Sequence, residues 1–297
     1  MFDWQFLALL IVNGVLTGLM YGLIALGFVL VYKATDAFNF AQGEMVMFAG
    51  LLVAVAMDAY GAPLWAAVAV GLGSMTLFGF ALERLVLRPL TGRPAIAVIM
   101  ATFGLAYILR GVGPLAWGAE TRALPLPVSD APLVLGPLPI SRVELIGAGL
   151  SLVFLVVFAW FFLKSRRGIA MRAIADDQPV AMAVGIDVRR YFGMAWAMTG
   201  IVSALAGIVW GNMLGVDVQL SLVGLKVFPV VILGGLDSIA GAVVGGLTVG
   251  VVENLAAGYL DPYVGGGTKD FVPYLLMIAV LIVRPYGLFG KPLIERV

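Results

Sequence analysis

The chain has 297 residues, of which 62% are hydrophobic and 12% are charged, and its net charge is +1. About a quarter of the residues in an ordinary soluble domain are charged, so this composition excludes that class. The sequence contains neither cysteine nor histidine, which excludes disulfides, imidazole relays and metal sites built from Cys or His.

Long apolar segments recur along the whole chain. Each is close to the 20 residues that a helix needs to cross a hydrocarbon core of about 30 Å, and the alternation typical of a membrane barrel is absent from the sequence. The sequence therefore predicts an all-α, polytopic transmembrane helical bundle of about eight to ten spans, forming a single domain over residues 1–297. The segments cover residues 6–32, 38–57, 63–87, 94–116, 142–163, 191–214, 220–235, 239–258 and 271–284.

Two of these segments are predicted to be broken helices. The second opens with "FNFAQGEMVMFAG", which brings Asn39, Gln42 and Glu44 into the entry of a span. The seventh is short and carries Lys226 and Pro229.

The second half of the chain repeats the first half in type. The first three apolar segments recur as the sixth, seventh and eighth, and an odd number of segments precedes the second copy. Interrupted segments at matching places in two halves indicate an inverted repeat around a translocation path.

Glycines recur at helical spacing in the first and eighth segments, where small residues allow close helix contacts. We expect these contacts to lie within one subunit; a dedicated dimer face is the alternative. The glycines are Gly14, Gly18, Gly22, Gly241, Gly245, Gly246 and Gly250.

Lysine and arginine are concentrated in the connection 83–93, in residues 164–190 and from residue 284 onward, whereas loops 117–141 and 259–270 contain few. Because basic residues mark cytoplasmic loops, this distribution predicts a periplasmic N-terminus and a cytoplasmic C-terminus. Residues 117–141 are then a periplasmic loop, and residues 164–190 are a cytoplasmic segment.

Glu44, Lys226 and Glu253 fall inside or near apolar segments. An unpaired charge at the centre of a lone membrane helix costs about 2.5–3.5 kcal/mol, so each needs a partner or a wet cavity. One interpretation is that they line a translocation path; the other is that they cap broken helices and cross-link spans. Both interpretations apply to the polar residues Asn13, Asn39, Gln42, Glu44, Lys226, Glu253 and Asn254.

The cytoplasmic segment contains "RRGIAMRAIADDQPVAMAVGIDVRRY", residues 166–191. A first helix is predicted through "GIAMRAIA"; Asp176 or Asp177 then N-caps a second helix, with Pro179 in its first turn and Gly185 as its stop. We expect the small residues Ala181 and Ala183 to be exposed, together with the basic side chains. Such a surface suits a protein partner or lipid headgroups.

Catalytic motifs are missing from the sequence. The Gly290-Lys291 pair lacks the upstream glycine of a P-loop, and no Gly-x-Ser-x-Gly is present. The chain is therefore not expected to be an enzyme or to hydrolyse ATP.

Three motifs, taken in order along the chain, resemble LivH-type permeases, the membrane subunits of bacterial branched-chain amino acid ABC importers. They are "NGVLTGLMYGLIALGFVLVYKATDAFNFAQGEMVMFAG" (13–50), "GIAMRAIADDQPVAMAVGIDV" (168–188), and "VILGGLDSIAGAVVGGLTVGVVE" with "VRPYGLFG" in the C-terminal third. The similarity covers essentially the whole length.

This resemblance implies a non-catalytic permease subunit of the bacterial inner membrane, without a cofactor or a nucleic-acid partner. Its implied partners are an M-type permease, two cytoplasmic ATPases and a periplasmic binding protein. It also implies that residues 164–190 form the segment that couples to the ATPase, with Arg172 and Arg189 as ionic rim contacts. The implied coupling residues are Arg172, Ala173, Asp176, Asp177, Pro179, Ala183 and Gly185.

The substrate implied by the resemblance is a branched-chain amino acid. Alternatives are a permease of the same architecture for urea, amides or sugars, and a stand-alone secondary transporter. The transporter would have no need of a docking surface in residues 166–191.

Overall fold

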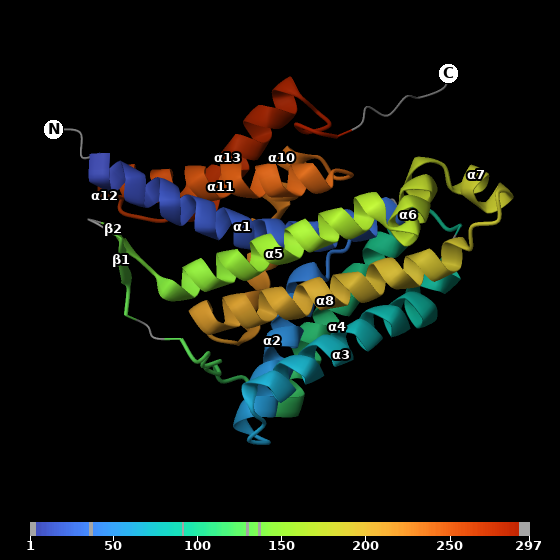
Figure 1. The fold of residues 1–297 in the computed structure, drawn as a ribbon, viewed down its shortest axis with the longest axis horizontal. Helices are drawn as coiled ribbons and strands as arrows, with labels where there is room; N and C mark the ends of the chain where they lie inside the picture. Colours follow the sequence, from blue (N-terminus) through green and yellow to red (C-terminus); the bar gives the residue numbers. More distant parts are fainter. Residues whose placement is uncertain (1–3, 36–37, 91, 129–130, 136–137, 291–297) are drawn as a thin grey trace. The chain divides into compact units, whose positions relative to one another are not determined.

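The fold is described here from a computed structural model, which describes residues 4–35, 38–90, 92–128, 131–135 and 138–290 (Figure 1). This part of the chain is almost entirely helical, which confirms the predicted all-α polytopic bundle. A two-stranded antiparallel hairpin, β1 (Leu133–Leu135) and β2 (Leu138–Ile140), lies within the predicted loop 117–141. Sequence analysis did not predict this hairpin.

The chain divides into two compact units. Unit 1 comprises Met1–Ala25, Pro127–Leu155 and Lys226–Val297, and unit 2 comprises Leu26–Leu126 and Val156–Leu225. The helices of unit 1 are the first part of α1 (Trp4–Thr35), the first part of α5 (Arg142–Lys164), α10 (Phe228–Gly234), α11 (Ile239–Tyr259), α12 (Asp261–Val264) and α13 (Thr268–Val283).

Unit 2 holds the remainder of α1 and α5 together with two short irregular helices that continue α3. Its further elements are α2 (Gln42–Asp58), α3 (Leu64–Leu82), the π-helix η1 (Glu83–Leu87), the 3₁₀ turn η2 (Arg88–Leu90), α4 (Ala95–Trp117), α6 (Arg166–Asp176), α7 (Gln178–Ala183), α8 (Val188–Leu214), the 3₁₀ turn η3 (Val218–Ser221) and α9 (Leu222–Lys226).

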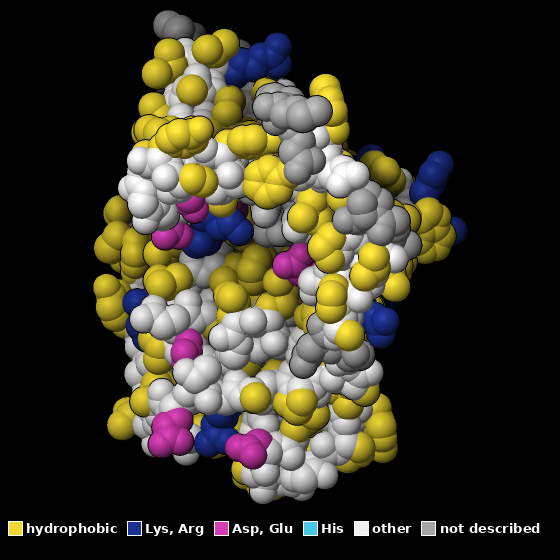
Figure 2. Space-filling view, turned by 90° about the vertical axis from the view of Figure 1, so that its left-hand side faces the viewer, with side chains coloured by type: hydrophobic (Ala, Val, Ile, Leu, Met, Phe, Trp, Pro, Cys, Tyr) yellow, Lys and Arg dark blue, Asp and Glu magenta, His cyan; other side chains and the backbone are white. Residues whose placement is uncertain are grey.

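All nine predicted apolar segments occur as helices. Six described helices are long and apolar enough to cross a membrane, whereas α2 and α13 have 17 and 16 residues. Segment 220–235 is broken, as predicted, because it is divided among η3, α9 and α10. Figure 2 shows one face of the molecule, on which hydrophobic side chains are widespread and basic side chains lie close to acidic ones in small groups.

In unit 1, α1 and α11 pack antiparallel through glycines. A Cβ atom on Gly18 would lie 2.6 Å from the carbonyl oxygen of Gly246, and one on Gly14 would lie 2.6 Å from the Cα atom of Val251. Gly22 lies farther along α1 and faces Ala242, which comes earlier in α11. The glycine contacts therefore lie within one chain, as predicted, and they bring two backbones together where lipid offers no hydrophobic drive.

In unit 2, α8 packs in the same manner on α3 and α2. A Cβ on Gly200 would overlap the Met75 carbonyl oxygen, and one on Gly79 would overlap the Trp196 carbonyl oxygen. The pairing runs antiparallel, since Gly79 follows Met75 whereas Trp196 precedes Gly200. Gly207 of α8 approaches α2 equally closely.

Each of these two glycine-mediated helix contacts joins a helix from one copy of the predicted repeat to a helix from the other copy. Helix α8 begins the second copy and packs on α3, the third element of the first copy. Helix α1 begins the first copy and packs on α11, the third element of the second copy. This reciprocal pairing is consistent with the repeat, and the inversion stays a prediction.

The core of unit 2 surrounds Trp196, which is fully buried. Methionines Met45 of α2 and Met75 of α3 pack against it with residues of α4 and α8. The packed core thus joins α2, α3, α4 and α8 around Trp196.

Candidate functional site

The two helices predicted within residues 166–191 are present as α6 and α7, and of Asp176 and Asp177 it is Asp177 that caps the second. Ser165 caps α6 by accepting a hydrogen bond from the Gly168 amide at 2.9 Å. Asp177 caps α7 by accepting one from the Val180 amide at 2.9 Å, and Pro179 lies in the first turn. Gly185 then adopts a φ of +87°, which a residue with a side chain rarely adopts, and ends the helix.

Helices α6 and α7 are held to the start of α8 by a small apolar cluster. Ile174, Ala181, Val188 and Phe192 are buried together, so the predicted exposure of Ala181 is wrong. Ala181 lies on the inner side of α7, whereas Ala183 is exposed as predicted.

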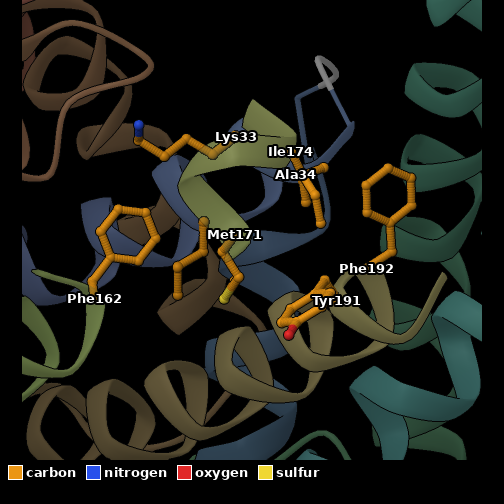
Figure 3. Close-up of a pocket in the computed structure, with 8 residues that line it drawn as sticks. Lys33, Ala34, Phe162, Met171, Ile174, Tyr191 and Phe192 are labelled. Carbon is orange, nitrogen blue, oxygen red and sulfur yellow. The ribbon is translucent and has the colours of Figure 1, made fainter. Parts of the chain in front are cut away.

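A pocket opens beside this cluster, between the end of α1, the end of α5 and α6 (Figure 3). Met171 and Tyr191 line it, and the ammonium of Lys33 lies 5.6 Å from the ring centroid of Phe162. The aromatic contact holds a cation beside an apolar pocket.

The outward side of α6 and α7 carries large apolar side chains among its charged ones. Four large side chains are at least half exposed, although they stand in a segment with many charges. They are Ile169 (51%), Val180 (57%), Met182 (52%) and Val184 (72%).

The predicted coupling residues do not all face solvent. Arg172 turns back to donate to the Leu163 carbonyl at 3.1 Å, so it satisfies a carbonyl at the C-terminal end of α5. Asp176, Asp177 and Pro179 are exposed, and Ala173 is half-buried.

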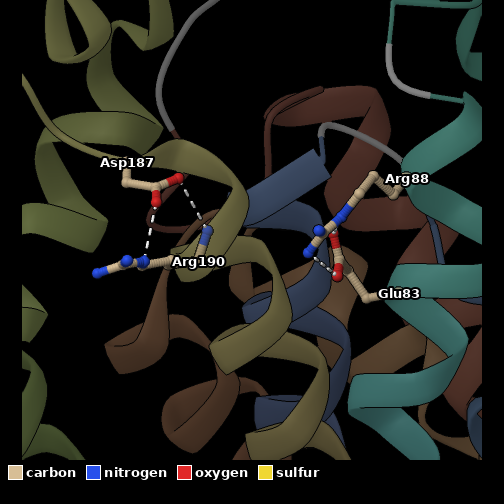
Figure 4. Close-up of polar contacts among 4 residues, drawn as sticks. All are labelled: Glu83, Arg88, Asp187 and Arg190. Carbon is tan, nitrogen blue, oxygen red and sulfur yellow. Dashed lines mark hydrogen bonds and ion pairs between the residues drawn. The ribbon is translucent and has the colours of Figure 1, made fainter.

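Glu83, in the π-helical turn after α3, is buried and forms a bidentate ion pair with Arg88 at 2.8 and 3.1 Å (Figure 4). Figure 4 also shows the exposed pair of Asp187 and Arg190, at 2.9 Å. Glu83 and Arg88 line a cavity of about 360 Å³ together with Gln178 of α7. The arginines of residues 83–93 were interpreted from the sequence as the signal of a loop, and the buried Glu83 was not predicted.

A hydrogen-bonded chain of polar side chains crosses the start of α2. Asn39 donates to Gln42 at 3.1 Å, and Gln42 donates to the Ser203 hydroxyl of α8 at 3.1 Å. The side-chain oxygen Oδ1 of Asn39 also accepts a hydrogen bond from the Ala41 backbone amide at 3.1 Å. Asn39 and Gln42, two of the predicted path candidates, thus join the start of α2 to α8.

Glu44 forms an ion pair with Arg110 of α4, and the same arginine nitrogen donates to the Ser221 hydroxyl of η3 at 3.1 Å. The Glu44 side chain is 8% exposed and that of Arg110 is 36% exposed. Sequence analysis found Glu44 but missed Arg110 and Ser221, because their pairing joins residues 66 and 111 positions apart. A lone arginine inside the apolar segment 94–116 was the available signal.

The buried acid of unit 1, Glu253, has different partners from those of Glu44. Glu253 of α11 is 4% exposed and accepts a hydrogen bond from the Tyr21 hydroxyl at 3.3 Å, while its Oε2 atom has no hydrogen-bond partner among the described residues. Lys226 forms an ion pair with Asp270 of α13 at 2.8 Å. Asn254 donates to the Gly250 carbonyl of its own helix at 2.9 Å.

The predicted path candidates therefore fall into two groups. Asn39, Gln42 and Glu44 are joined to unit 2 helices, and Lys226 and Glu253 belong to unit 1. Asn13, also in unit 1, is half-buried and its Oδ1 atom has no hydrogen-bond partner in the described chain.

The α12–α13 junction lies outside the long apolar helices. Asp261 Oδ1 accepts hydrogen bonds from the hydroxyl of Thr268 at 2.5 Å and from its amide at 3.0 Å. These bonds hold the pKa of Asp261 below its usual value because they favour the ionised carboxylate.

Helices of membrane-spanning length, glycine seams and internally paired polar groups define a polytopic membrane protein. Residues 10–281 match the family described as "Branched-chain amino acid transport system / permease component", and the chain belongs to this family.

The curated relatives agree with this family. The chain is 31% identical to the high-affinity branched-chain amino acid transport system permease protein LivH of Escherichia coli K12, over 96% of each chain. It is 31% identical to the corresponding protein BraD of Pseudomonas aeruginosa, over 97% of each. The autoinducer 2 import system permease protein LsrC of Shigella flexneri is 27% identical, over 63% of this chain and 55% of that protein.

Proposed function

We propose that this chain is the non-catalytic permease subunit of an ABC importer in the bacterial inner membrane, and that it carries branched-chain amino acids. The proposed substrate class is supported by the similarity to LivH and BraD over nearly the full length of each protein. The predicted orientation places the N-terminus in the periplasm and the C-terminus in the cytoplasm.

The α6–α7 segment is the surface on which a cytoplasmic ATPase docks in this proposal. Its support is the exposed apolar set on two short helices whose ends are fixed by Ser165, Asp177 and Gly185. Movement of a docked ATPase would reach α8 through Ala181 and Phe192, because these residues share one buried cluster. A stand-alone transporter would have no use for this exposed set.

The remaining partners follow from the same proposal. An M-type permease completes the path, a second ATPase completes the nucleotide sites, and a periplasmic binding protein delivers the substrate. The polar groups around Glu44 and Glu253 are the path candidates, and each also cross-links helices.

Reconstitution into proteoliposomes tests the proposal. The complex of this chain with its permease, ATPase and binding-protein partners should take up radiolabelled L-leucine when ATP is supplied, and uptake should stop with a non-hydrolysable nucleotide. Uptake of L-leucine without ATPase subunits would favour the stand-alone transporter. ATP-driven uptake of urea, an amide or a sugar but not of leucine would favour the alternative importer of the same architecture.

A further inference from the structure

We propose that Glu44 and Arg110 form the head-group site for the transported α-amino acid, with Glu44 binding the ammonium group and Arg110 binding the carboxylate. This inference rests on the proposed function, since it assigns the recognition of an amino-acid zwitterion to specific residues in unit 2. Ser221 is the neutral third member of the site.

The pair already carries the two charges that a zwitterion would complement. Glu44 is nearly buried, so its carboxylate needs a positive partner at all times. Arg110 supplies that partner in this structure. A bound amino acid would separate the two side chains while leaving each one next to an opposite charge, which limits the electrostatic cost of opening the pair.

Arg110 retains donors that its present contacts do not use. Its Nη2 atom binds both Glu44 and Ser221, whereas its buried Nε atom has no hydrogen-bond partner among the described residues. A guanidinium has five N–H donors in a planar fork that matches the two oxygens of a carboxylate. About a third of the Arg110 side chain is also exposed, so a ligand can approach it.

The Glu83–Arg88 pair of the same unit is a useful contrast. Both of its carboxylate oxygens accept from separate arginine nitrogens, in a closed bidentate arrangement. It comes from one continuous helical stretch, whereas Glu44, Arg110 and Ser221 come from three elements that are far apart in the sequence.

A groove lined mainly by apolar side chains continues from the pair along the same three elements. Met47 lies one turn beyond Glu44 on α2, Pro114 lies one turn beyond Arg110 on α4, and Val218 lies one turn before Ser221 on η3; all three line the groove. Leu51 and Val216 extend its apolar lining, and the acidic residues Glu120 and Asp217 also line it.

The groove holds a cavity of about 10 Å³ in this structure, enough for roughly one water molecule. It is therefore too narrow here for an amino-acid side chain. An aliphatic side chain could lie along it once α2, α4 and η3 move apart, with the zwitterionic head group at the ion pair.

A charge exchange separates recognition from simple cross-linking. The double variant Glu44→Arg with Arg110→Glu keeps an ion pair between α2 and α4, but it exchanges the two head-group subsites relative to the apolar groove. We expect a complex that assembles and unfolds near the wild-type temperature, while ATP-driven uptake of L-leucine falls at least tenfold. Uptake within threefold of wild type would overturn the proposal, since the pair would then serve only as a cross-link.

A neutral double variant provides a second test in case the charge-exchanged protein misfolds. Glu44→Gln with Arg110→Gln keeps hydrogen bonding without charge, and we again expect assembly with at least tenfold lower uptake; uptake near wild type would overturn the proposal. If the wild-type complex itself transports no amino acid, the proposed function falls, and this inference falls with it. If the wild-type complex transports L-leucine and the double variants do so at nearly the same rate, this inference is overturned and the proposed function stands.

Discussion

Glu44 and Glu253 are both glutamates buried in helices, and the two units satisfy them in different ways. Glu44 faces the guanidinium of Arg110, whereas Glu253 accepts from the Tyr21 hydroxyl and keeps one oxygen without a hydrogen-bond partner among the described residues. Lys226, one of two lysines of unit 1 near Glu253, forms its ion pair with Asp270.

This difference shows that a buried acid alone does not define a binding site. Glu44 belongs to a group that carries both signs of charge and adjoins a groove, so it can exchange its partner for a zwitterion. Glu253 lies on α11 near the glycine seam with α1, where close backbone contact leaves little room for a ligand. We therefore expect unit 2 to recognise the head group and the α1–α11 pair of unit 1 to act as a rigid support.

The largest effect is expected for Arg110→Gln. Removing the cation leaves Glu44 buried with only neutral partners, and breaking a buried pair from one side costs about 3–5 kcal/mol. Because Arg110 is partly exposed, we expect about 3 kcal/mol of lost unfolding free energy, measured by thermal or denaturant unfolding in detergent. The double variant Glu44→Gln with Arg110→Gln should recover most of that loss; no recovery would mean that the pair is not the cause.

The glycine seam gives the next effect. Gly18→Ala places a Cβ 2.6 Å from the Gly246 carbonyl oxygen, and overpacking of this kind costs about 1–3 kcal/mol. Gly149→Ala on α5 is the matched control, because a Cβ there meets nothing within 4 Å. It should be neutral or add up to about 1 kcal/mol through helix propensity. Equal stability changes in the two variants would contradict the α1–α11 packing.

A smaller effect is expected for Glu253→Gln. The amide oxygen can still accept from the Tyr21 hydroxyl, and the described hydrogen bonds place no basic residue on the carboxylate, so the loss should stay below about 1 kcal/mol. The same substitution at Glu44 should cost clearly more in the same unfolding assay. Equal losses at the two positions would remove the distinction between the two acids.

The smallest effect concerns acid stability at the α12–α13 junction. The folded-state pKa of Asp261 lies below the usual value of 3.8, so its contribution to stability is present above that value and is lost as the pH falls through the folded pKa. Thr268→Ala removes the hydroxyl bond and should reduce the decrease in stability between about pH 5 and pH 2. An unchanged pH profile of unfolding would show that this bond does not perturb Asp261.

Local features of the fold could be predicted from the sequence. The Asp177 cap, the Gly185 stop and the broken segment 220–235 depend on neighbouring residues, and so they are visible in a short stretch. The glycine spacing likewise indicated close helix contacts, although it did not indicate that α1 would pair with α11.

The partners of the polar groups could not be predicted, because they come from distant elements. Arg110 lies 66 residues from Glu44, and Tyr21 lies 232 residues from Glu253. The burial of Ala181 was also predicted wrongly, since the side of α7 that faces α8 depends on the packing of Phe192. Periodicity over six residues cannot specify such a contact.

The account of this chain as a coupled permease depends most directly on the α6–α7 surface. The decisive measurement is a pull-down of the chain from its native membrane in mild detergent, with mass spectrometry of the co-purified proteins, for wild type and for Val184→Asp. Val264→Asp is the matched control, because Val264 is similarly exposed on the predicted periplasmic side. We predict that P-loop ATPases and a second permease accompany the wild type and the control, and that Val184→Asp loses the ATPases alone. A wild-type chain that purifies without any ATPase would contradict the account.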